Sequence, residues 1–170
     1  MSATAEPIVV VGGGLAGGTL VVELRNLGFD GPIVSLCGEP HPPYERPPLS
    51  KSFLRGESPA EGTYLKPAAW YGDNGVDLRT GGEVRAIDLA GRRVTTAEGD
   101  VEYGRLVLAT GCRARRLPVA SSDAVAVHHL RSLEDSTALK DSLVDGARPL
   151  VVGGGWIGLE VAASARARGV

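Results

Sequence analysis

Ile8-Val9-Val10-Val11-Gly12-Gly13-Gly14-Leu15-Ala16-Gly17 is the stretch that decides the fold. Its apolar, β-branched run predicts a buried strand, and the glycine fingerprint after it predicts a tight turn into a helix. In such a unit the first glycine makes the turn, the second lets the backbone approach a pyrophosphate, and the third lets the helix pack closely on the strand. The stretch therefore predicts the start of a dinucleotide-binding βαβ unit.

A second fingerprint of the same kind lies near the other end of the chain. Leu150-Val151-Val152 predicts a strand, Gly153-Gly154-Gly155-Trp156-Ile157-Gly158 predicts the turn, and residues 156–168 are predicted to be helical. Two fingerprints predict two bound dinucleotides, and the simplest reason to hold two is to pass a hydride between nicotinamide and flavin. Because the sequence stops where the next strand is expected, we expect the second unit to be truncated.

Between the fingerprints the pattern alternates helices, strands and loops. The proline-rich stretch 40–48 excludes helix and inner strand and predicts a functional loop. From Asp77 onward, short strands with turn signals predict an antiparallel excursion that returns to the main sheet at Leu106-Val107-Leu108. The predicted fold class is thus α/β, a Rossmann-like FAD/NAD(P)-binding fold with a small antiparallel β excursion. The predicted helices are 15–27, 49–54, 67–71 and 133–143, and the predicted strands are 33–37, 83–88, 93–96, 101–108 and 126–130.

Composition excludes several classes of function. The chain has 170 residues, is 43% hydrophobic and carries a net charge of −2, which gives no case for a nucleic-acid or membrane surface. No apolar run approaches the roughly 20 residues that span a bilayer. The N-terminus has neither the basic start nor the apolar stretch of a leader sequence, so we expect a cytoplasmic protein.

Cysteine and histidine usage argues against a thiol or metal site. Cys37 and Cys112 form no CxxC pair, which argues against a redox-active disulfide and against a thiol-ligated metal. We interpret both as small, buried apolar residues. His41, His128 and His129 are too few and too poorly spaced for a metal centre, and we interpret them as structural.

Glu39 is the first candidate binding residue outside the glycines. It lies beyond the strand predicted over 33–37, where a carboxylate can accept the hydroxyls of an adenosine ribose. The alternative is a solvated loop charge, and Gly38 stands between the strand and Glu39, so the placement of this carboxylate stays open.

Three segments together resemble a known family. Residues 39–51, Glu39-Pro40-His41-Pro42-Pro43-Tyr44-Glu45-Arg46-Pro47-Pro48-Leu49-Ser50-Lys51, look like the hallmark segment of the FAD-dependent ferredoxin and rubredoxin reductases that serve bacterial oxygenases and cytochromes P450. Residues 106–111 resemble the ATG segment of two-dinucleotide flavoproteins, and residues 153–163 are similar to this family's NADH-binding start. The resemblance covers the whole chain, and the Arg-Pro-Pro-Leu-Ser-Lys run is its family-specific part.

The resemblance implies a set of cofactor-binding residues. Glu39 would bind the adenosine ribose of FAD, the backbone of Val84 would meet the adenine, and Arg131 would contact FAD, although alone it would be taken for a surface charge. The glycine-loop and ATG positions that it implies are Gly12, Gly14, Ala16 and Gly17 for the FAD pyrophosphate, Ala109, Thr110 and Gly111 for the ATG segment, and Gly153, Gly155 and Gly158 for NADH.

The resemblance also implies a catalytic pair. Lys51 would place a cation near the flavin ring, where it favours the reduced, anionic form, and Glu160 would pair with it. The alternative is two surface charges on separate helices. Arg46 is predicted either to contact the flavin or to brace the proline loop, and Trp156 either to pack over the nucleotide or to enter a domain interface.

The family further implies the reaction and its partners. It passes a hydride from NADH to FAD and then single electrons to a [2Fe–2S] ferredoxin or a rubredoxin; the residue that separates NADH from NADPH is expected beyond this sequence, so NADPH stays open. The alternatives are another two-dinucleotide flavoprotein, such as an NADH oxidase, or a truncated and catalytically inactive nucleotide-binding fragment. We expect residues 1–117 to be the N-terminal part of an FAD-binding domain and residues 118–170 the incomplete start of an NAD(P)H-binding domain.

Overall fold

The computed structural model describes residues 6–116 and 125–170 and divides into two compact units. The first unit comprises residues 6–45 and 64–111, and the second comprises residues 46–63, 112–116 and 125–170. The predicted domain boundary lies between residues 117 and 118, outside the described residues. Residues 1–5, for which we predict no leader sequence, also lie outside them.

A four-stranded parallel sheet forms the centre of the first unit. Its strands stand in the order β3-β2-β1-β7, so the chain leaves β1 on one side and returns on the other. Their register aligns Ile8 with Ile33 and with Arg105. The strands are β1 (Ile8–Val11), β2 (Ile33–Cys37), β3 (Val76–Thr80) and β7 (Arg105–Leu108).

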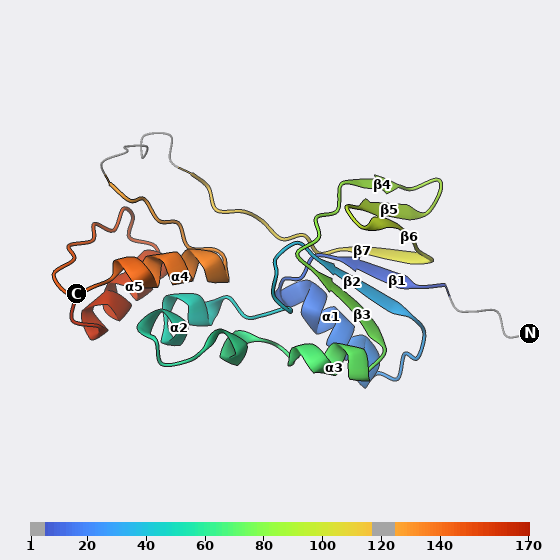
Figure 1. Cartoon of the computed structure of the whole chain (residues 1–170), viewed down its shortest axis with the longest axis horizontal. Helices are drawn as coiled ribbons and strands as arrows, with labels where there is room; N and C mark the ends of the chain where they lie inside the picture. Colours follow the sequence, from blue (N-terminus) through green and yellow to red (C-terminus); the bar gives the residue numbers. More distant parts are fainter. Residues whose placement is uncertain (1–5, 117–124) are drawn as a thin grey trace, which may run out of the picture. The chain divides into compact units, whose positions relative to one another are not determined.

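Alternate residues of β1 supply two hydrophobic cores, as a strand buried on both faces requires. Ile8 and Val10 pack with residues of helices α1 (Leu15–Asn26) and α3 (Ala68–Asp73). Val9 and Val11 pack on the other face with Val94. Figure 1 shows α1 and α3 on one side of the parallel sheet and the small antiparallel sheet on the other.

The antiparallel sheet is the predicted excursion. Its order is β4-β5-β6, and all its pairs are antiparallel. The strands are β4 (Ala86–Asp88), β5 (Arg93–Thr96) and β6 (Gly99–Glu102). With the parallel sheet, it confirms the predicted α/β fold class.

Helices build the second unit. A cluster of Leu54, Leu139, Leu143 and Ala165 forms its core. No strand occurs in the part of this unit that the structure describes. Its elements are the 3₁₀ turns η1 (Pro47–Ser50) and η2 (Ala60–Thr63) and the helices α2 (Ser52–Arg55), α4 (Leu133–Ser142) and α5 (Trp156–Ala167).

Three strand predictions are wrong. Residues 126–130 and 150–152 form no strand, and Leu150 and Val152 are largely exposed. A strand is held by hydrogen bonds to a neighbour, and neither segment belongs to the two sheets. The antiparallel excursion predicted from Asp77 is also wrong at its start, because residues 76–80 form the edge strand β3 of the parallel sheet.

No helix within residues 6–116 and 125–170 combines the length and the apolar character needed to cross a membrane.

Candidate functional site

The first fingerprint has the geometry that its glycines require. Gly12 has a φ of +119°, and a Cβ on it would lie 2.2 Å from the carbonyl oxygen of Ala109. A Cβ on Gly17 would lie 2.0 Å from the carbonyl oxygen of Gly12. Both positions must therefore be glycine for the loop, the helix and the segment after β7 to pack as they do.

Gly14 differs, because this chain's own packing gives no reason for a glycine there. Its φ of −76° and ψ of −178° suit any residue, and a Cβ on it would meet no described atom within 4 Å. Gly14 also caps α1, which has no side-chain cap and no acidic residue in its first turn. The first backbone N–H groups of such a helix form an anion site, and the exposed Ala16 lies in that turn. Gly14 leaves room for a ligand beside these groups.

The carboxyl ends of β1, β2 and β7 carry the predicted residues of the first unit. The Ala109 N–H donates to the Val11 carbonyl, which holds the Ala109-Thr110-Gly111 segment against the end of β1. Glu39 follows β2, and its carboxylate accepts a hydrogen bond from the Tyr44 hydroxyl. In open α/β sheets a ligand binds beyond the carboxyl ends of the strands, where the strand order reverses. That point lies at β1, with β2 and β7 on either side.

Val84 lies apart from these loop contacts. It lies two residues before the start of β4, and its side chain is partly buried against the core that contains Val94 and Tyr103. The structure thus accounts for Val84 as a packing residue, and its backbone contact with an adenine stays a prediction.

In the second unit the structure brings together Lys51 and Glu160. The Nζ of Lys51 lies 2.9 Å from Oε1 of Glu160, and the Ser50 hydroxyl donates to Oε2 of Glu160 over 2.5 Å. The hydrogen bond from Ser50, followed by that from Lys51, holds the pKa of Glu160 below its ordinary value. The alternative of two separate surface charges is excluded, and Ser50 is a partner of Glu160 that the sequence interpretation missed.

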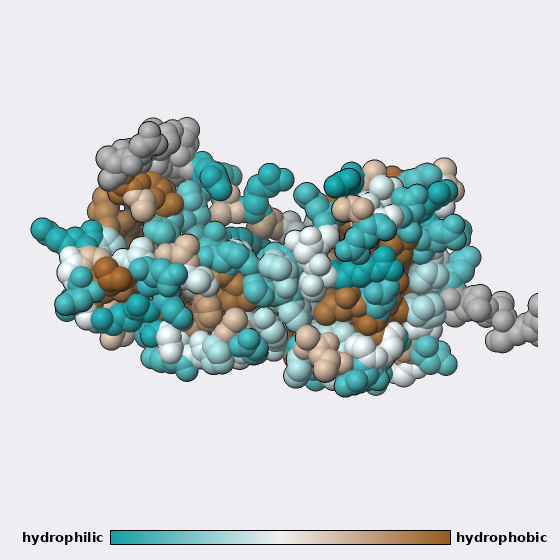
Figure 2. Space-filling view, viewed as in Figure 1, coloured by the Kyte–Doolittle hydropathy of each residue, from teal (hydrophilic) through white to brown (hydrophobic). Residues whose placement is uncertain are grey.

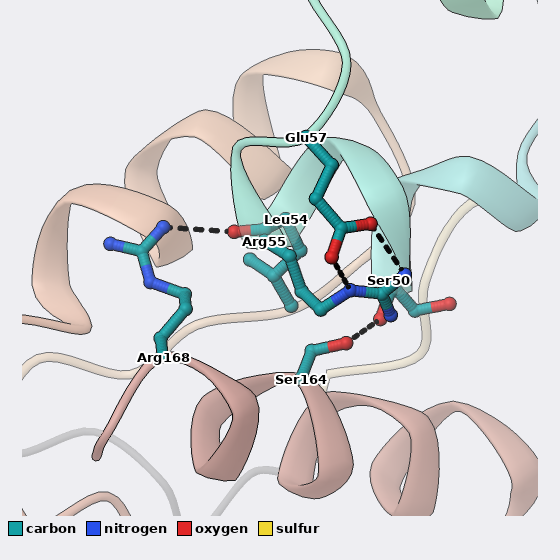
Figure 3. A network of polar contacts seen from close by, with 6 residues as sticks. All are labelled: Ser50, Leu54, Arg55, Glu57, Ser164 and Arg168. Atoms are coloured by element: carbon teal, nitrogen blue, oxygen red, sulfur yellow. Dashed lines mark hydrogen bonds and ion pairs between the residues drawn. The ribbon is translucent and has the colours of Figure 1, made fainter.

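Two buried hydroxyls and an arginine hold the backbone of residues 49–54, which include Ser50 and Lys51. The Ser164 hydroxyl of α5 donates to the Ser50 carbonyl over 2.6 Å, and the Ser136 hydroxyl of α4 donates to the Leu49 carbonyl over the same distance. Arg168 donates to the Leu54 carbonyl. Figure 3 shows the contact of Ser164 with Ser50 and that of Arg168 with Leu54. The signal that could have found the two serines is a small hydroxyl residue on the inner face of each helix.

Arg131 is positioned by the start of α4. Ser132 and Asp135 form a reciprocal capping box, and the Asp135 carboxylate also accepts from the Arg131 N–H. Arg46 donates to the Arg131 carbonyl, so it braces Arg131 in a way that neither sequence alternative described. The Nε of Arg131 is buried and has no hydrogen-bond partner among the described residues. A buried donor without a partner is costly, which favours a ligand acceptor at this point.

The second fingerprint repeats the geometry of the first without a flanking strand. Gly153 has a φ of +107°, and a Cβ on Gly158 would lie 2.9 Å from the Gly153 carbonyl oxygen. A Cβ on Gly155, the N-cap of α5, would meet no described atom within 4 Å. Trp156 is 85% exposed, and both roles predicted for it stay predictions.

A cavity of 270 Å³ in the second unit gathers these groups. Three cationic side chains and one carboxylate line it together with apolar groups, a combination that suits an anionic ligand with an aromatic part. Figure 2 shows hydrophobic surface on this unit, in which Trp156 and Ile157 are exposed. The lining residues are Arg46, Pro47, Leu49, Ser50, Lys51, Leu130, Arg131, Trp156, Ile157 and Glu160.

Residues 6–170 of the chain match the sequence model of the pyridine nucleotide-disulphide oxidoreductase family. Among curated proteins, the ferredoxin–NAD(+) reductase component of the biphenyl dioxygenase system of Paraburkholderia xenovorans is 43% identical over 162 residues. The alignment covers 95% of this chain and 40% of that protein. The rubredoxin–NAD(+) reductase of Pseudomonas putida is 43% identical over 160 residues, which cover 93% of this chain and 41% of that reductase. The chain thus spans about two-fifths of the length of these relatives.

A solved structure agrees with the sequence matches. The putidaredoxin reductase–putidaredoxin complex is matched with a TM-score of 0.90 and 39% identity over 98% of this chain and 41% of the matched chain.

Proposed function

The chain belongs to the pyridine nucleotide-disulphide oxidoreductase family, and on this premise we propose that it is part of an FAD-dependent NADH:ferredoxin or NADH:rubredoxin reductase. The whole protein would pass a hydride from NADH to FAD and then single electrons to a ferredoxin or rubredoxin. The relatives named for this activity, such as the biphenyl dioxygenase ferredoxin–NAD(+) reductase, support the proposal. We also propose residues 1–117 as part of the FAD-binding domain and residues 118–170 as the start of the NAD(P)H-binding domain.

The observation that carries the proposal is the ion pair between Lys51 and Glu160. Lys51 ends the family-specific Arg-Pro-Pro-Leu-Ser-Lys run, and Glu160 belongs to the helix that opens from the second fingerprint. Through this pair, the helix of the second fingerprint contacts the lysine that we assign to the flavin. Two charges with no role beyond solubility would not need to be paired in this way.

The first unit fits the dinucleotide part of FAD. The open space at Gly14 and the uncapped start of α1 suit a pyrophosphate, to which N–H groups would donate. The Glu39 carboxylate, at the end of β2, would accept the adenosine ribose hydroxyls. We assign Gly12, Gly17 and the Ala109–Gly111 segment to the shape of this cradle.

The second unit fits the chemistry of a flavin reduced by a nicotinamide nucleotide. When bound, FAD supplies the change from two-electron hydride transfer to one-electron transfer. The Lys51 ammonium, oriented by Glu160, would stabilise negative charge that develops on the ring. The buried Nε of Arg131 would donate to the cofactor, and Arg46 would keep Arg131 in place. Gly153, Gly155 and the start of α5 would receive the NADH pyrophosphate.

The choice of electron acceptor tests the proposed function. The intact protein is loaded with FAD, reduced with NADH without oxygen, and mixed with a [2Fe–2S] ferredoxin, with rubredoxin or with dissolved oxygen. Reoxidation of the flavin by ferredoxin or rubredoxin much faster than by oxygen supports the reductase. Oxygen as the fastest acceptor would support an NADH oxidase instead, and no reduction by NADH would support an inactive nucleotide-binding protein.

A further inference from the structure

The side chain and the backbone of Glu39 are both anchored within the first unit. Its carboxylate accepts a hydrogen bond from the Tyr44 hydroxyl, and its carbonyl accepts one from the Gly81 N–H over 2.9 Å. Gly81 directly follows the edge strand β3. A residue that follows a strand and loop would otherwise sample several rotamers, each with a different direction for its carboxylate. The anchors restrict Glu39 to one of these directions.

Tyr44 is itself held firmly, so it can act as a fixed donor. Its side chain is 1% exposed, and its backbone forms an isolated antiparallel bridge with Tyr64. The neighbouring Leu65 N–H donates to the Pro43 carbonyl over 2.9 Å. The proline-rich loop is thus ordered around Tyr44 by main-chain contacts.

The loop also packs closely on helix α1. A Cβ on Gly18 would lie 2.4 Å from Cβ of Pro43 and 2.7 Å from Cδ1 of Leu65. Only a glycine at position 18 lets both loop segments approach this helix. Gly18 lies in the helix that follows the first fingerprint, so this close packing fixes the position of the Tyr44 loop on that helix.

His41 packs against the ring of Tyr44. Its ring lies edge-on to that of Tyr44, with centroids 6.2 Å apart and planes at 88°. The Tyr64 hydroxyl lies 3.3 Å from Nδ1 of His41. The Tyr64 hydroxyl therefore contacts the histidine, whereas the Tyr44 hydroxyl donates a hydrogen bond to the carboxylate of Glu39.

From this arrangement we propose that Tyr44 is a positioning residue, which orients the Glu39 carboxylate toward the adenosine ribose of FAD and so contributes to recognition of its 2′-hydroxyl. The inference rests on the proposed function, in which Glu39 binds that ribose. It assigns a purpose to the loop between β2 and η1 beyond carrying Arg46 and Lys51. Tyr44 acts through Glu39 and needs no contact of its own with the cofactor.

The test measures the dissociation constants of two ligands for the intact apoprotein. The ligands are FAD and the FAD analogue that lacks the 2′-hydroxyl on its adenosine ribose, and flavin fluorescence reports their binding. Tyr44→Phe keeps the buried ring and removes only the hydroxyl. We expect it to weaken FAD binding about fivefold, as for the loss of one hydrogen bond, and to narrow the preference for FAD over the analogue. Tyr64→Phe is the matched control, with an unchanged preference.

A double-variant comparison separates the positioning role from the proposed function. With Glu39→Ala already present, Tyr44→Phe should have no further effect on FAD binding, because the two residues act as one unit. If Glu39→Ala weakens FAD binding but Tyr44→Phe changes neither the affinity nor the preference, the positioning role is overturned. If Glu39→Ala itself leaves both unchanged, the ribose assignment within the proposed function fails, and the inference falls with it.

Discussion

The ammonium of Lys51 and the carboxylate of Glu160 lie 2.9 Å apart, although Lys51 follows the proline-rich run and Glu160 stands in the helix of the second fingerprint. Ser50 donates to the second oxygen of the same carboxylate. The Glu160 carboxylate thus binds the side chains of two consecutive residues, Ser50 and Lys51. The side chains of Lys51 and Glu160 are 45% and 30% exposed, so solvent screens the pair and its purpose is better sought in function than in stability.

Replacing Lys51 should impair chemistry without unfolding the protein. We predict that Lys51→Ala slows reduction of bound FAD by NADH on the order of tenfold or more, because it removes a cation that stabilises developing negative charge. The denaturation midpoint should hardly change, since a solvent-screened ion pair contributes little to stability. Anaerobic stopped-flow absorbance measures the rate. Lys66→Ala, which removes another lysine, is the control and should reduce at the normal rate.

Replacing Ser50 should move a pH dependence. The Ser50 hydroxyl is the main cause of the lowered pKa of Glu160, so Ser50→Ala should raise that pKa toward its ordinary value. Glu160 then gains its proton at a higher pH, and the acid limb of NADH-driven flavin reduction should shift upward in pH. Stopped-flow rates at a series of pH values measure the shift. An acid limb that stays in place would contradict the assigned role of Ser50.

A matched serine supplies the control for this experiment. The Ser142 hydroxyl donates to the Leu139 carbonyl of its own helix over 2.7 Å. Ser142→Ala also removes one hydroxyl from the second unit, but it should leave the acid limb of the rate profile unchanged.

The glycines of the first fingerprint should separate folding from binding. Gly17→Ala places a Cβ 2.0 Å from the Gly12 carbonyl oxygen, so we predict a lower free energy of unfolding. Gly14→Ala meets no described atom, so the fold should persist while FAD affinity falls roughly tenfold or more. Urea denaturation and FAD titration measure the two effects. A Gly14→Ala protein that binds FAD normally would argue against the phosphate cradle.

The two cysteines should differ in reactivity. Cys37 is fully buried, as predicted, and this burial raises the pKa of its thiol. The same prediction is wrong for Cys112, which is exposed. A raised pKa leaves less of the reactive thiolate at neutral pH. We predict that iodoacetamide modifies Cys112 in the folded protein and Cys37 only after denaturation, as read by peptide mass spectrometry. Equal modification of both in the folded state would show that the end of β2 is not closed.

Local sequence patterns predicted β1, α1 and β2 well, because these two strands are buried on both faces and the fingerprint between β1 and α1 requires glycine for reasons of geometry. Residues 33–37 and the helix beginning at Leu15 were predictable in this way. Residues 150–152 were not, because a strand also needs a hydrogen-bonded neighbour, which the local pattern cannot supply.

The site shows a similar division. The pairing of Lys51 with Glu160 came from the family resemblance, and proximity in space was needed to establish it. The hydroxyls of Ser50, Ser136 and Ser164 donate to a carboxylate or to backbone carbonyls far away in the sequence. A small hydroxyl residue on a buried face indicates a buried donor, but the sequence does not identify its acceptor. The ribose role of Glu39 stays a prediction, as do the cofactor contacts of Val84 and Arg131.

The most direct test of the central claim is a visible absorption spectrum of the purified protein after incubation with FAD and desalting, followed by NADH without oxygen. We predict that a flavin band is retained and then bleaches when NADH is added. A protein that retains no flavin, or a retained flavin band that NADH leaves unchanged, would contradict the account.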